Sequence, residues 1–274
     1  MQAIKDILAK YNSSSLGENS SLTSTVIDMP SYTCDLCQDK GIVLVGDSAR
    51  PCQCMKQKEL FKRFKHARMS DQLMQQSFAK FKLDYYSKLL ADPVKNISYY
   101  ETAQKALAGA KRFVEEYLES GNSAGLMFVG SVGCGKTFLA CAIANALLEQ
   151  DKQVLFLVVP DLLDELRATY GRKDSDTTEQ DLLDTARTVP VLVLDDLGAH
   201  NYTDWTINRI YTIINYRLNH RLPTIITTNL DIRQLNEFLG ERTCSRLLEM
   251  CRGFELYVER DIRMLKYKER ENRI

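Results

Sequence analysis

Five short apolar runs alternate with segments of helical period from about residue 100 onward. The runs cover residues 125–129, 153–159, 190–195, 223–227 and 254–258, and each has the length of a buried strand. A longer helical segment, residues 100–119, precedes the first run. Because strands that alternate with helices form parallel sheets, the pattern predicts an α/β fold with a five-stranded parallel sheet flanked by helices.

The N-terminal part of the chain lacks this alternation. Residues 12–25 are small and polar, which predicts a linker, and residues 55–67 are basic with helical period. Residues 71–98 carry aromatic side chains in an irregular pattern, which favours a docking segment. We therefore expect an N-terminal region at 1–70, a linking and docking segment at 71–98 and an α/β domain at 99–274.

The composition is that of an ordinary soluble globular protein, with 45% hydrophobic and 26% charged residues. The formal net charge is zero, so any contact with nucleic acid has to come from local basic patches. No apolar run approaches the roughly 20 residues that cross a bilayer, and the N-terminus lacks the apolar core of a secretion signal. We expect a cytoplasmic protein with no membrane partner.

The first apolar run leads directly into a glycine-rich loop of the form G-x-x-x-x-G-K-[ST]. Glycines in such a loop let successive backbone N–H groups point at phosphate oxygens. Lys136 can then reach the β- and γ-phosphates, and the Thr137 hydroxyl can ligate Mg²⁺. The position between a strand and a helix predicts a site for ATP and Mg²⁺. The expected binding residues are Gly130, Ser131, Val132, Gly133, Cys134, Gly135, Lys136, Thr137 and Phe138.

Polar side chains end two of the other predicted strands. The run at 190–195 ends in Asp195 and is followed by Asp196, and Asn229 comes two residues after the run at 223–227. Carboxyl ends of parallel strands lie at the nucleotide-binding edge of such sheets, so we expect Asn229 to lie beside Asp195. Asp195 is suited to hold Mg²⁺, Asp196 to polarise the attacking water, and Asn229 to orient that water or contact the γ-phosphate.

This order of motifs resembles the AAA+ ATPase core. Within it, the chain looks like the DnaC/DnaI-type replicative helicase loaders and the related IstB transposition ATPases over roughly residues 75–265. The resemblance implies an ATPase that loads the replicative DNA helicase hexamer onto single-stranded DNA during replication initiation, with hydrolysis coupled to release. The motifs that carry it are Asp195-Asp-Leu-Gly198, Thr203-Asp-Trp205, Ile214-Asn-Tyr-Arg217, Thr228-Asn-Leu-Asp231 and Gly240-Glu-Arg-Thr-Cys-Ser-Arg246-Leu.

The resemblance also implies roles for two arginines. In that family a Ser-Arg-Leu box carries an arginine finger that reaches the nucleotide of a neighbouring subunit, which implies this role for Arg246 and self-association into an ATP-bridged oligomer. Arg242 is the alternative finger. Loaders of this family have a truncated C-terminal lid, and Arg263 matches their sensor arginine, although a basic surface tail is the alternative reading.

The segment after Gly198 is the candidate DNA contact. In helicase loaders the corresponding segment has been assigned to single-stranded DNA, which implies Thr203 and Trp205 as contacts. The helix that follows bears Arg209 and Arg217, and aromatic, hydroxyl and basic groups together suit stacking on bases and contact with phosphates. Helix packing is the alternative role for Trp205.

Four of the eight cysteines form a C-x₂-C…C-x-C pattern around a hairpin-like stretch at 40–46. Four thiolates suit tetrahedral Zn²⁺, with His66 as a distant substitute ligand, and a ribbon of this size needs a metal to be stable. Some DnaI-like loaders have a zinc-binding N-terminal region that contacts the helicase, but the basic segment that follows could equally touch DNA. The expected ligands, within the module at 34–54, are Cys34, Cys37, Cys52 and Cys54.

Three other functions remain open at this point. An IstB-like transposition helper would share the same core, although the cysteine module has no evident role in it. A small-molecule kinase would need an acceptor pocket, for which residues 160–185 offer few groups. A module that binds nucleotide without hydrolysing it is the remaining alternative.

Overall fold

The computed structural model describes residues 34, 36–46, 48–52, 54–55, 75–92, 95–169, 178–199 and 202–271. The predicted linker at 12–25 and most of the predicted basic helix lie outside the described residues, as does His66.

The N-terminal cysteine module contains a two-stranded antiparallel hairpin. Its strands are β1 (Ile42–Val45) and β2 (Ser48–Pro51). The Cys52 N–H donates to the Gly41 carbonyl at 2.8 Å, which closes the base of the hairpin. The hairpin expected between the two cysteine pairs is therefore present.

The central element of the rest of the chain is a five-stranded sheet in the order β4-β5-β6-β3-β7, and every neighbouring pair is parallel. The last strand begins at Cys251, three residues before the predicted start, because it follows the end of a helix without a connecting loop. The strands are β3 (Gly125–Gly130), β4 (Val154–Val158), β5 (Val191–Leu197), β6 (Thr224–Thr228) and β7 (Cys251–Leu256).

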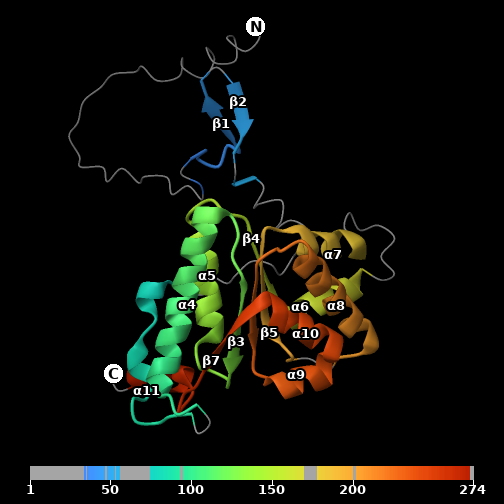
Figure 1. Ribbon diagram of the computed structural model, residues 1–274. Helices are drawn as coiled ribbons and strands as arrows, with labels where there is room; N and C mark the ends of the chain where they lie inside the picture. The colour runs from blue at the N-terminus through green and yellow to red at the C-terminus, as the bar shows by residue number, and fades with distance from the viewer. Residues whose placement is uncertain are drawn as a thin grey trace, which may run out of the picture. The chain divides into compact units, whose positions relative to one another are not determined.

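Helices cover both faces of this sheet. Figure 1 shows α4 and α5 on one side of the strands and α6 to α10 on the other. The long helices of the first side are α4 (Tyr99–Ser120) and α5 (Lys136–Leu148). The other side carries α6 (Val159–Ala168), α7 (Glu179–Thr188), α8 (Asp204–Asn219), α9 (Ile232–Leu239) and α10 (Glu241–Met250).

Alternation along the strands divides the hydrophobic core into two layers. On β5, for example, Val191 and Val193 pack with α4 and α5, whereas Leu192 and Leu194 pack with α6 to α10. Successive side chains of a strand point to opposite faces, so a strand that is buried on both faces is apolar throughout. This explains why the strands appear in the sequence as continuous apolar runs.

Capping residues set the helix boundaries. Ser98 and Glu101 form a capping box at the start of α4, and Gly121, with φ of 73°, ends it. Thr178 and Asp181 form a capping box that starts α7 at Glu179.

Residues 75–92 pack against the core through two 3₁₀ turns, η1 (Phe78–Lys80) and η2 (Leu83–Tyr85). Phe81 and Tyr86 are buried in the layer formed by α4 and α5. The Tyr86 hydroxyl donates to the carbonyl of Cys134 at 2.7 Å, which connects this segment to the glycine-rich loop.

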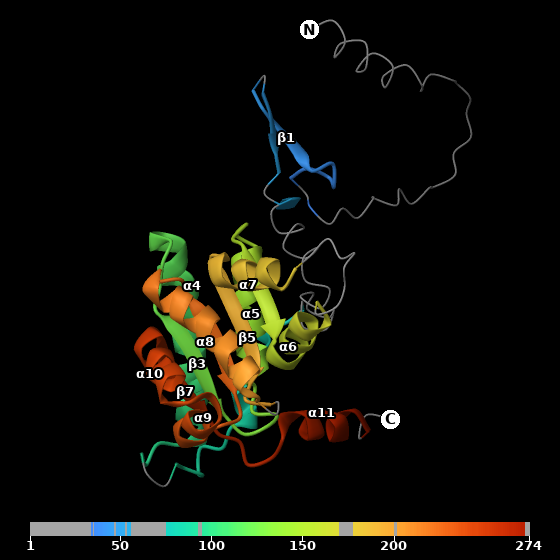
Figure 2. The ribbon, with the colours of Figure 1, turned by 90° about the vertical axis from the view of Figure 1, so that its right-hand side faces the viewer.

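A final helix, α11 (Ile262–Glu271), follows β7. Figures 1 and 2 show it at the end of the core where the strands finish. Among the described residues, no helix is both long and apolar enough to cross a membrane.

Candidate functional site

The glycine-rich loop joins β3 to α5 at the carboxyl edge of the sheet. Gly130, Gly133 and Gly135 all have positive φ, at 153°, 72° and 99°. A Cβ on Gly130 would lie 2.1 Å from the Leu256 carbonyl oxygen, so the loop passes too close to β7 for any side chain there. The curled backbone expected from the sequence is therefore present at the amino end of α5.

Lys136 is folded back into this loop. Its ammonium donates to the carbonyls of Gly130 and Ser131, both at 2.8 Å, and to Oδ1 of Asn229 at 2.7 Å. An ammonium has three protons, so these three oxygen acceptors satisfy it, and Sγ of Cys134 lies 3.6 Å away as a weaker fourth contact. A phosphate oxygen that binds Lys136 must replace one of them.

Thr137 and Asp195 meet as the sequence predicts. The Thr137 hydroxyl lies 2.9 and 3.2 Å from the two carboxylate oxygens of Asp195 and donates to them. Burial raises the pKa of Asp195, an effect that the hydrogen bonds from Thr227 and Thr137 oppose. Two adjacent oxygen donors, one of them a carboxylate, are a donor set that fits Mg²⁺.

Asn229 contacts Asp196 rather than Asp195. Its amide nitrogen donates to Oδ1 of Asp196 at 2.8 Å, while its amide oxygen accepts from Lys136. Asn229 thus links the lysine of the loop to the second acid of β5. Hydrogen bonds therefore join the loop after β3 to the ends of β5 and β6.

These side chains line a cavity of about 580 Å³. Six of the nine predicted loop residues line it, whereas Gly130, Ser131 and Cys134 belong to the loop without lining the cavity. The lining residues are Gln76, Val132, Gly133, Gly135, Lys136, Thr137, Phe138, Val158, Asp195, Asp196, Thr227, Asn229, Ile262, Arg263 and Lys266.

Arg263 reaches this cavity because α11 is attached to the loop. The Ile262 N–H donates to the Gly133 carbonyl at 3.1 Å, and the Asp261 carboxylate accepts from the Arg263 N–H at 2.7 Å. A Cβ on Gly133 would lie 1.9 Å from Asp261 Oδ1, so only glycine fits beneath the start of α11.

A family model described as IstB-like ATP binding protein matches residues 62–251 of this chain. The chain belongs to the IstB-like ATP-binding protein family. The replicative helicase loader DnaC of Escherichia coli (strain K12) is 34% identical over 147 residues, which are 54% of this chain and 58% of that protein. The similarity thus spans just over half the length of this relative.

Solved loader structures share the fold of this IstB-like chain. A crystal structure of DnaI aligns with a TM-score of 0.54 and 32% identity, over 69% of this chain and 92% of that chain. A crystal structure of the DnaC helicase loader aligns with a TM-score of 0.55 and 30% identity, over 69% of this chain and 100% of that chain. With the five-stranded parallel sheet and its flanking helices, these similarities confirm the predicted AAA+-type fold.

The IstB-like core places Arg246 away from its own nucleotide cavity. Arg246 lies on α10, where Nε donates to Asn215 at 2.7 Å, Nη1 donates to the Arg242 carbonyl at 3.1 Å and the guanidinium lies over the Tyr211 ring. Nη2 has no hydrogen-bond partner among the described residues. The guanidinium is therefore held in one orientation with one nitrogen left for a further acceptor.

Trp205 is partly buried at the start of α8. It packs against the core, and the guanidinium groups of Arg167 and Arg209 lie over its ring at 5.7 and 5.4 Å. Thr203 is the capping residue of α8 and its hydroxyl accepts from the Thr206 N–H. Both residues therefore have structural contacts, and Thr203 is also exposed to solvent.

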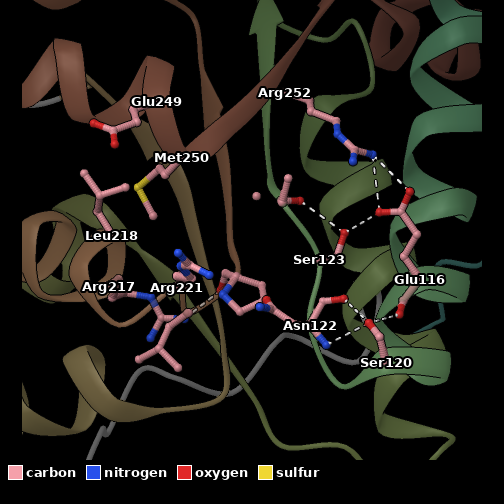
Figure 3. A pocket seen from close by; sticks show the side chains of 14 residues that line it. Glu116, Ser120, Asn122, Ser123, Arg217, Leu218, Arg221, Glu249, Met250 and Arg252 are labelled. Carbon is pink, nitrogen blue, oxygen red and sulfur yellow. Dashed lines mark hydrogen bonds and ion pairs between the residues drawn. The ribbon is translucent and has the colours of Figure 1, made fainter.

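The prediction that Arg217 contacts DNA is wrong, because its side chain is fully buried, with 0% exposure. Arg217 lies at the amino-terminal edge of the sheet, beside a second cavity of about 490 Å³. Figure 3 shows this cavity, with the Glu116–Arg252 ion pair on the side opposite Arg217. Burial lowers the pKa of Arg217 to about 9. Its guanidinium donates to the carbonyls of Ala186, Arg187, Val189, Pro190 and Pro223 and to the Thr224 hydroxyl.

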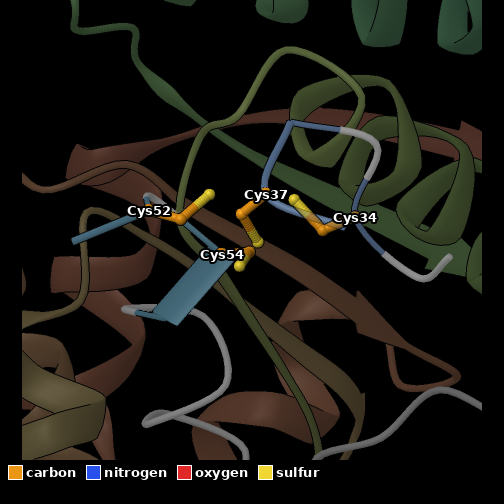
Figure 4. Close-up of side chains that lie close together, drawn as sticks. All are labelled: Cys34, Cys37, Cys52 and Cys54. Carbon is orange, nitrogen blue, oxygen red and sulfur yellow. The ribbon is translucent and has the colours of Figure 1, made fainter. Parts of the chain in front are cut away.

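The four N-terminal cysteines converge on one point (Figure 4). Their Sγ atoms all lie within 4.8 Å of one another, and Cys37 and Cys52 are buried. The structure thus brings the four predicted cysteines together, and four converging thiols are a donor set that fits a structural Zn²⁺ site. The other four cysteines of the chain are Cys134, Cys141, Cys244 and Cys251, and all are buried.

Seven residues that line the cavity or contact the loop are absent from the sequence-based prediction: Gln76, Tyr86, Val158, Thr227, Asp261, Ile262 and Lys266. Thr227 had a usable signal, because it stands near the end of β6 and two positions before Asn229, and alternate positions of an extended chain share a face. Tyr86 and Asp261 had none, since they contact the loop from segments far away in the chain.

Proposed function

We propose that this chain is an ATP-hydrolysing loader that places a replicative DNA helicase onto single-stranded DNA. The observation that carries the proposal is the hydrogen-bonded chain from Lys136 through Asn229 to Asp196, beside the Thr137–Asp195 pair. These residues belong to an IstB-like chain that is similar to the DnaC and DnaI loaders. Release of the helicase would be coupled to hydrolysis.

The nucleotide would lie in the cavity at the loop. Lys136 would turn from Asn229 to the γ-phosphate, because a phosphate oxygen is a stronger acceptor for an ammonium than an amide oxygen. Asn229, once released, could contact the attacking water or the γ-phosphate, and Asp196 is the candidate to polarise that water. Arg263 lines the same cavity and would contact the phosphates from α11.

Mg²⁺ would be held by Thr137 and Asp195. When bound, the ion would neutralise the negative charge that develops on the phosphates during transfer. The pair is already in contact, which supports this assignment. Zn²⁺ would be held by Cys34, Cys37, Cys52 and Cys54 and would stabilise the small N-terminal module.

Hydrolysis would need a second copy of the chain. Arg246 does not line the cavity of its own chain, which supports a role in the site of a neighbour. A guanidinium with one uncommitted nitrogen suits contact with a transferring phosphoryl group. Self-association into an ATP-bridged oligomer would bring Arg246 to that position.

The N-terminal module would bind the helicase hexamer, and the start of α8 would bind single-stranded DNA. Thr203 is exposed and Trp205 is half-buried between two guanidinium groups, which supports a surface for bases and phosphates. The same module could touch DNA instead, and a cysteine variant separates these partners. If the module binds the helicase, Cys52→Ser should weaken helicase capture and leave DNA affinity unchanged.

The decisive experiment is a loading assay with the full chain, a replicative helicase hexamer from the same genome and single-stranded DNA. We expect the chain to bind the helicase with ATP, to increase the amount of helicase on DNA, and to release it as ATP is hydrolysed. Lys136→Ala should abolish ATP-dependent loading. Absence of helicase binding with and without nucleotide contradicts the loader proposal.

A transposition helper is the second candidate, because the matching family model bears the IstB name. Such a helper would assemble on duplex DNA with ATP and would bind a transposase instead of a helicase. Capture of the transposase but not the helicase by the full chain would favour it. The four-cysteine module supports the loader, since the helper function gives that module no evident role.

A further inference from the structure

We propose that Thr227 is a positioning residue of the hydrolytic site, whose single hydroxyl holds both acids of β5 in place. The inference rests on the proposed ATP hydrolysis, and it adds a residue that neither the phosphate loop nor the strand-end acids include. Thr227 lies on β6, the strand next to β5, and its side chain is 1% exposed.

The hydroxyl makes one bond to each acid. It donates to Oδ1 of Asp195 at 2.6 Å and accepts from the backbone N–H of Asp196 at 2.9 Å. The directions follow from the partners, because a backbone N–H can only donate and an ionised carboxylate can only accept. One side chain thus fixes a carboxylate and the backbone of the next residue at the same time.

The bond to Asp196 replaces a missing bond of the sheet. The pairing of β5 with β6 is irregular between Leu194 and Leu197, and Asp196 has a φ of 60°. A non-glycine residue in the left-handed region persists only where its surroundings hold it. The Thr227 hydroxyl satisfies the Asp196 N–H at this irregularity, so it helps to set the direction in which the Asp196 carboxylate leaves the strand.

The bond to Asp195 orients the proposed Mg²⁺ ligand. Oδ1 of Asp195 accepts hydrogen bonds from both the Thr137 and the Thr227 hydroxyls, at 2.9 and 2.6 Å, which restricts rotation of the carboxylate. Groups that hydrogen-bond to a metal ligand fix its orientation, and their loss typically costs about 10- to 100-fold in metal affinity or activity. Thr227 would act through the two acids and would not contact the reacting atoms.

The neighbouring residue Thr228 provides a matched control. It is on the same strand and fully buried, but its hydroxyl accepts from the Leu230 N–H at 3.1 Å, and no hydrogen bond among the described residues joins it to either acid. Thr227→Val and Thr228→Val therefore remove the same group from adjacent positions. Only the first removes the bonds to Asp195 and Asp196.

The test compares Thr227→Val, Thr227→Ser and Thr228→Val with the unmodified full chain. Binding of a fluorescent ATP analogue is measured with and without Mg²⁺, and steady-state hydrolysis is measured with single-stranded DNA at concentrations that allow association. For Thr227→Val we expect unchanged binding without Mg²⁺, about 10- to 100-fold more Mg²⁺ needed for half-maximal binding, and a kcat lower by a similar factor with little change in KM. Thr227→Ser should restore both quantities to within about threefold, and Thr228→Val should leave both unchanged.

Equal Mg²⁺ dependence and equal kcat in Thr227→Val and the unmodified chain overturn the inference. Equal losses in Thr227→Val and Thr228→Val also overturn it, because they indicate a general packing effect. Thr227→Ala replaces Thr227→Val if the valine variant does not fold, with the same expected outcomes. If the unmodified chain never hydrolyses ATP, the proposed function fails, and the Mg²⁺ dependence of binding still decides the role of Thr227.

Discussion

Replacement of Arg246 by alanine tests whether hydrolysis needs a second copy of the chain. Within one chain the substitution removes hydrogen bonds to Asn215 at 2.7 Å and to the Arg242 carbonyl at 3.1 Å, and a contact over the Tyr211 ring at 4.9 Å. Together these contacts contribute about 1–2 kcal/mol to the free energy of unfolding. This is a small part of the roughly 5–15 kcal/mol that stabilise a typical domain, so the variant should fold.

The expected catalytic effect is larger than this structural one. An arginine that stabilises the transferring phosphoryl group contributes about 10³- to 10⁵-fold to kcat, which corresponds to about 4–7 kcal/mol of activation free energy. Nucleotide affinity should be unchanged, because Arg246 does not line the cavity of its own chain. Arg242→Ala is the control, since Arg242 is an exposed residue of the same helix and the alternative finger.

Mixing two inactive variants shows on which chain the arginine acts. Asp195→Asn should be inactive because its own site lacks the proposed Mg²⁺ ligand, yet it retains Arg246. Paired with Arg246→Ala, which has an intact site, it should restore part of the ATPase rate measured by phosphate release. Normal hydrolysis by Arg246→Ala alone refutes the reasoning, as does a mixture with no more activity than its two components.

Three other predictions follow from single contacts. Arg217→Met should lower the free energy of unfolding by about 3–5 kcal/mol, since it leaves buried carbonyls without a donor, and chemical denaturation will show whether Arg217→Lys loses less. Gly133→Ala should weaken nucleotide binding by at least about tenfold, because φ is 72° there and Asp261 occupies the space of a Cβ; fluorescence titration checks this, with Gly253→Ala, which meets no neighbour, as the control. Cys52→Ser should reduce bound zinc from about one ion per chain to near zero by elemental analysis, whereas Cys141→Ser should keep it.

Patterns that depend on near neighbours were readable from the amino-acid sequence. The five strands appeared as apolar runs because a parallel sheet is buried on both faces, and the helices between them have clear capping residues. The phosphate loop was equally readable, because its glycines, Lys136 and Thr137 act within eight consecutive residues. Asp195 could be assigned to the same edge of the sheet because parallel strands end together.

The tertiary structure decided which of these residues touch one another. Arg209 and Arg217 stand eight residues apart on one helix, yet Arg209 pairs with Glu179 near the surface and Arg217 is enclosed by backbone carbonyls. Nothing in the local sequence distinguishes them, because both environments are built by segments far away in the chain. The sequence likewise left open whether Trp205 contacts DNA or packs against a helix. Only the tertiary structure showed that its ring is partly buried and lies under the guanidinium groups of Arg167 and Arg209.

The chain alone therefore determined the fold class, the phosphate loop and the strand-end acids, since each depends on short-range spacing and on the geometry that parallel strands share. Only the folded molecule showed that Thr227 bridges the two acids, that Tyr86 supports the loop from an earlier segment, and that Arg246 lies outside its own cavity. Hydrogen bonds reach about 3 Å and join whatever the fold brings together, so long-range pairs of this kind leave no periodic trace in the sequence.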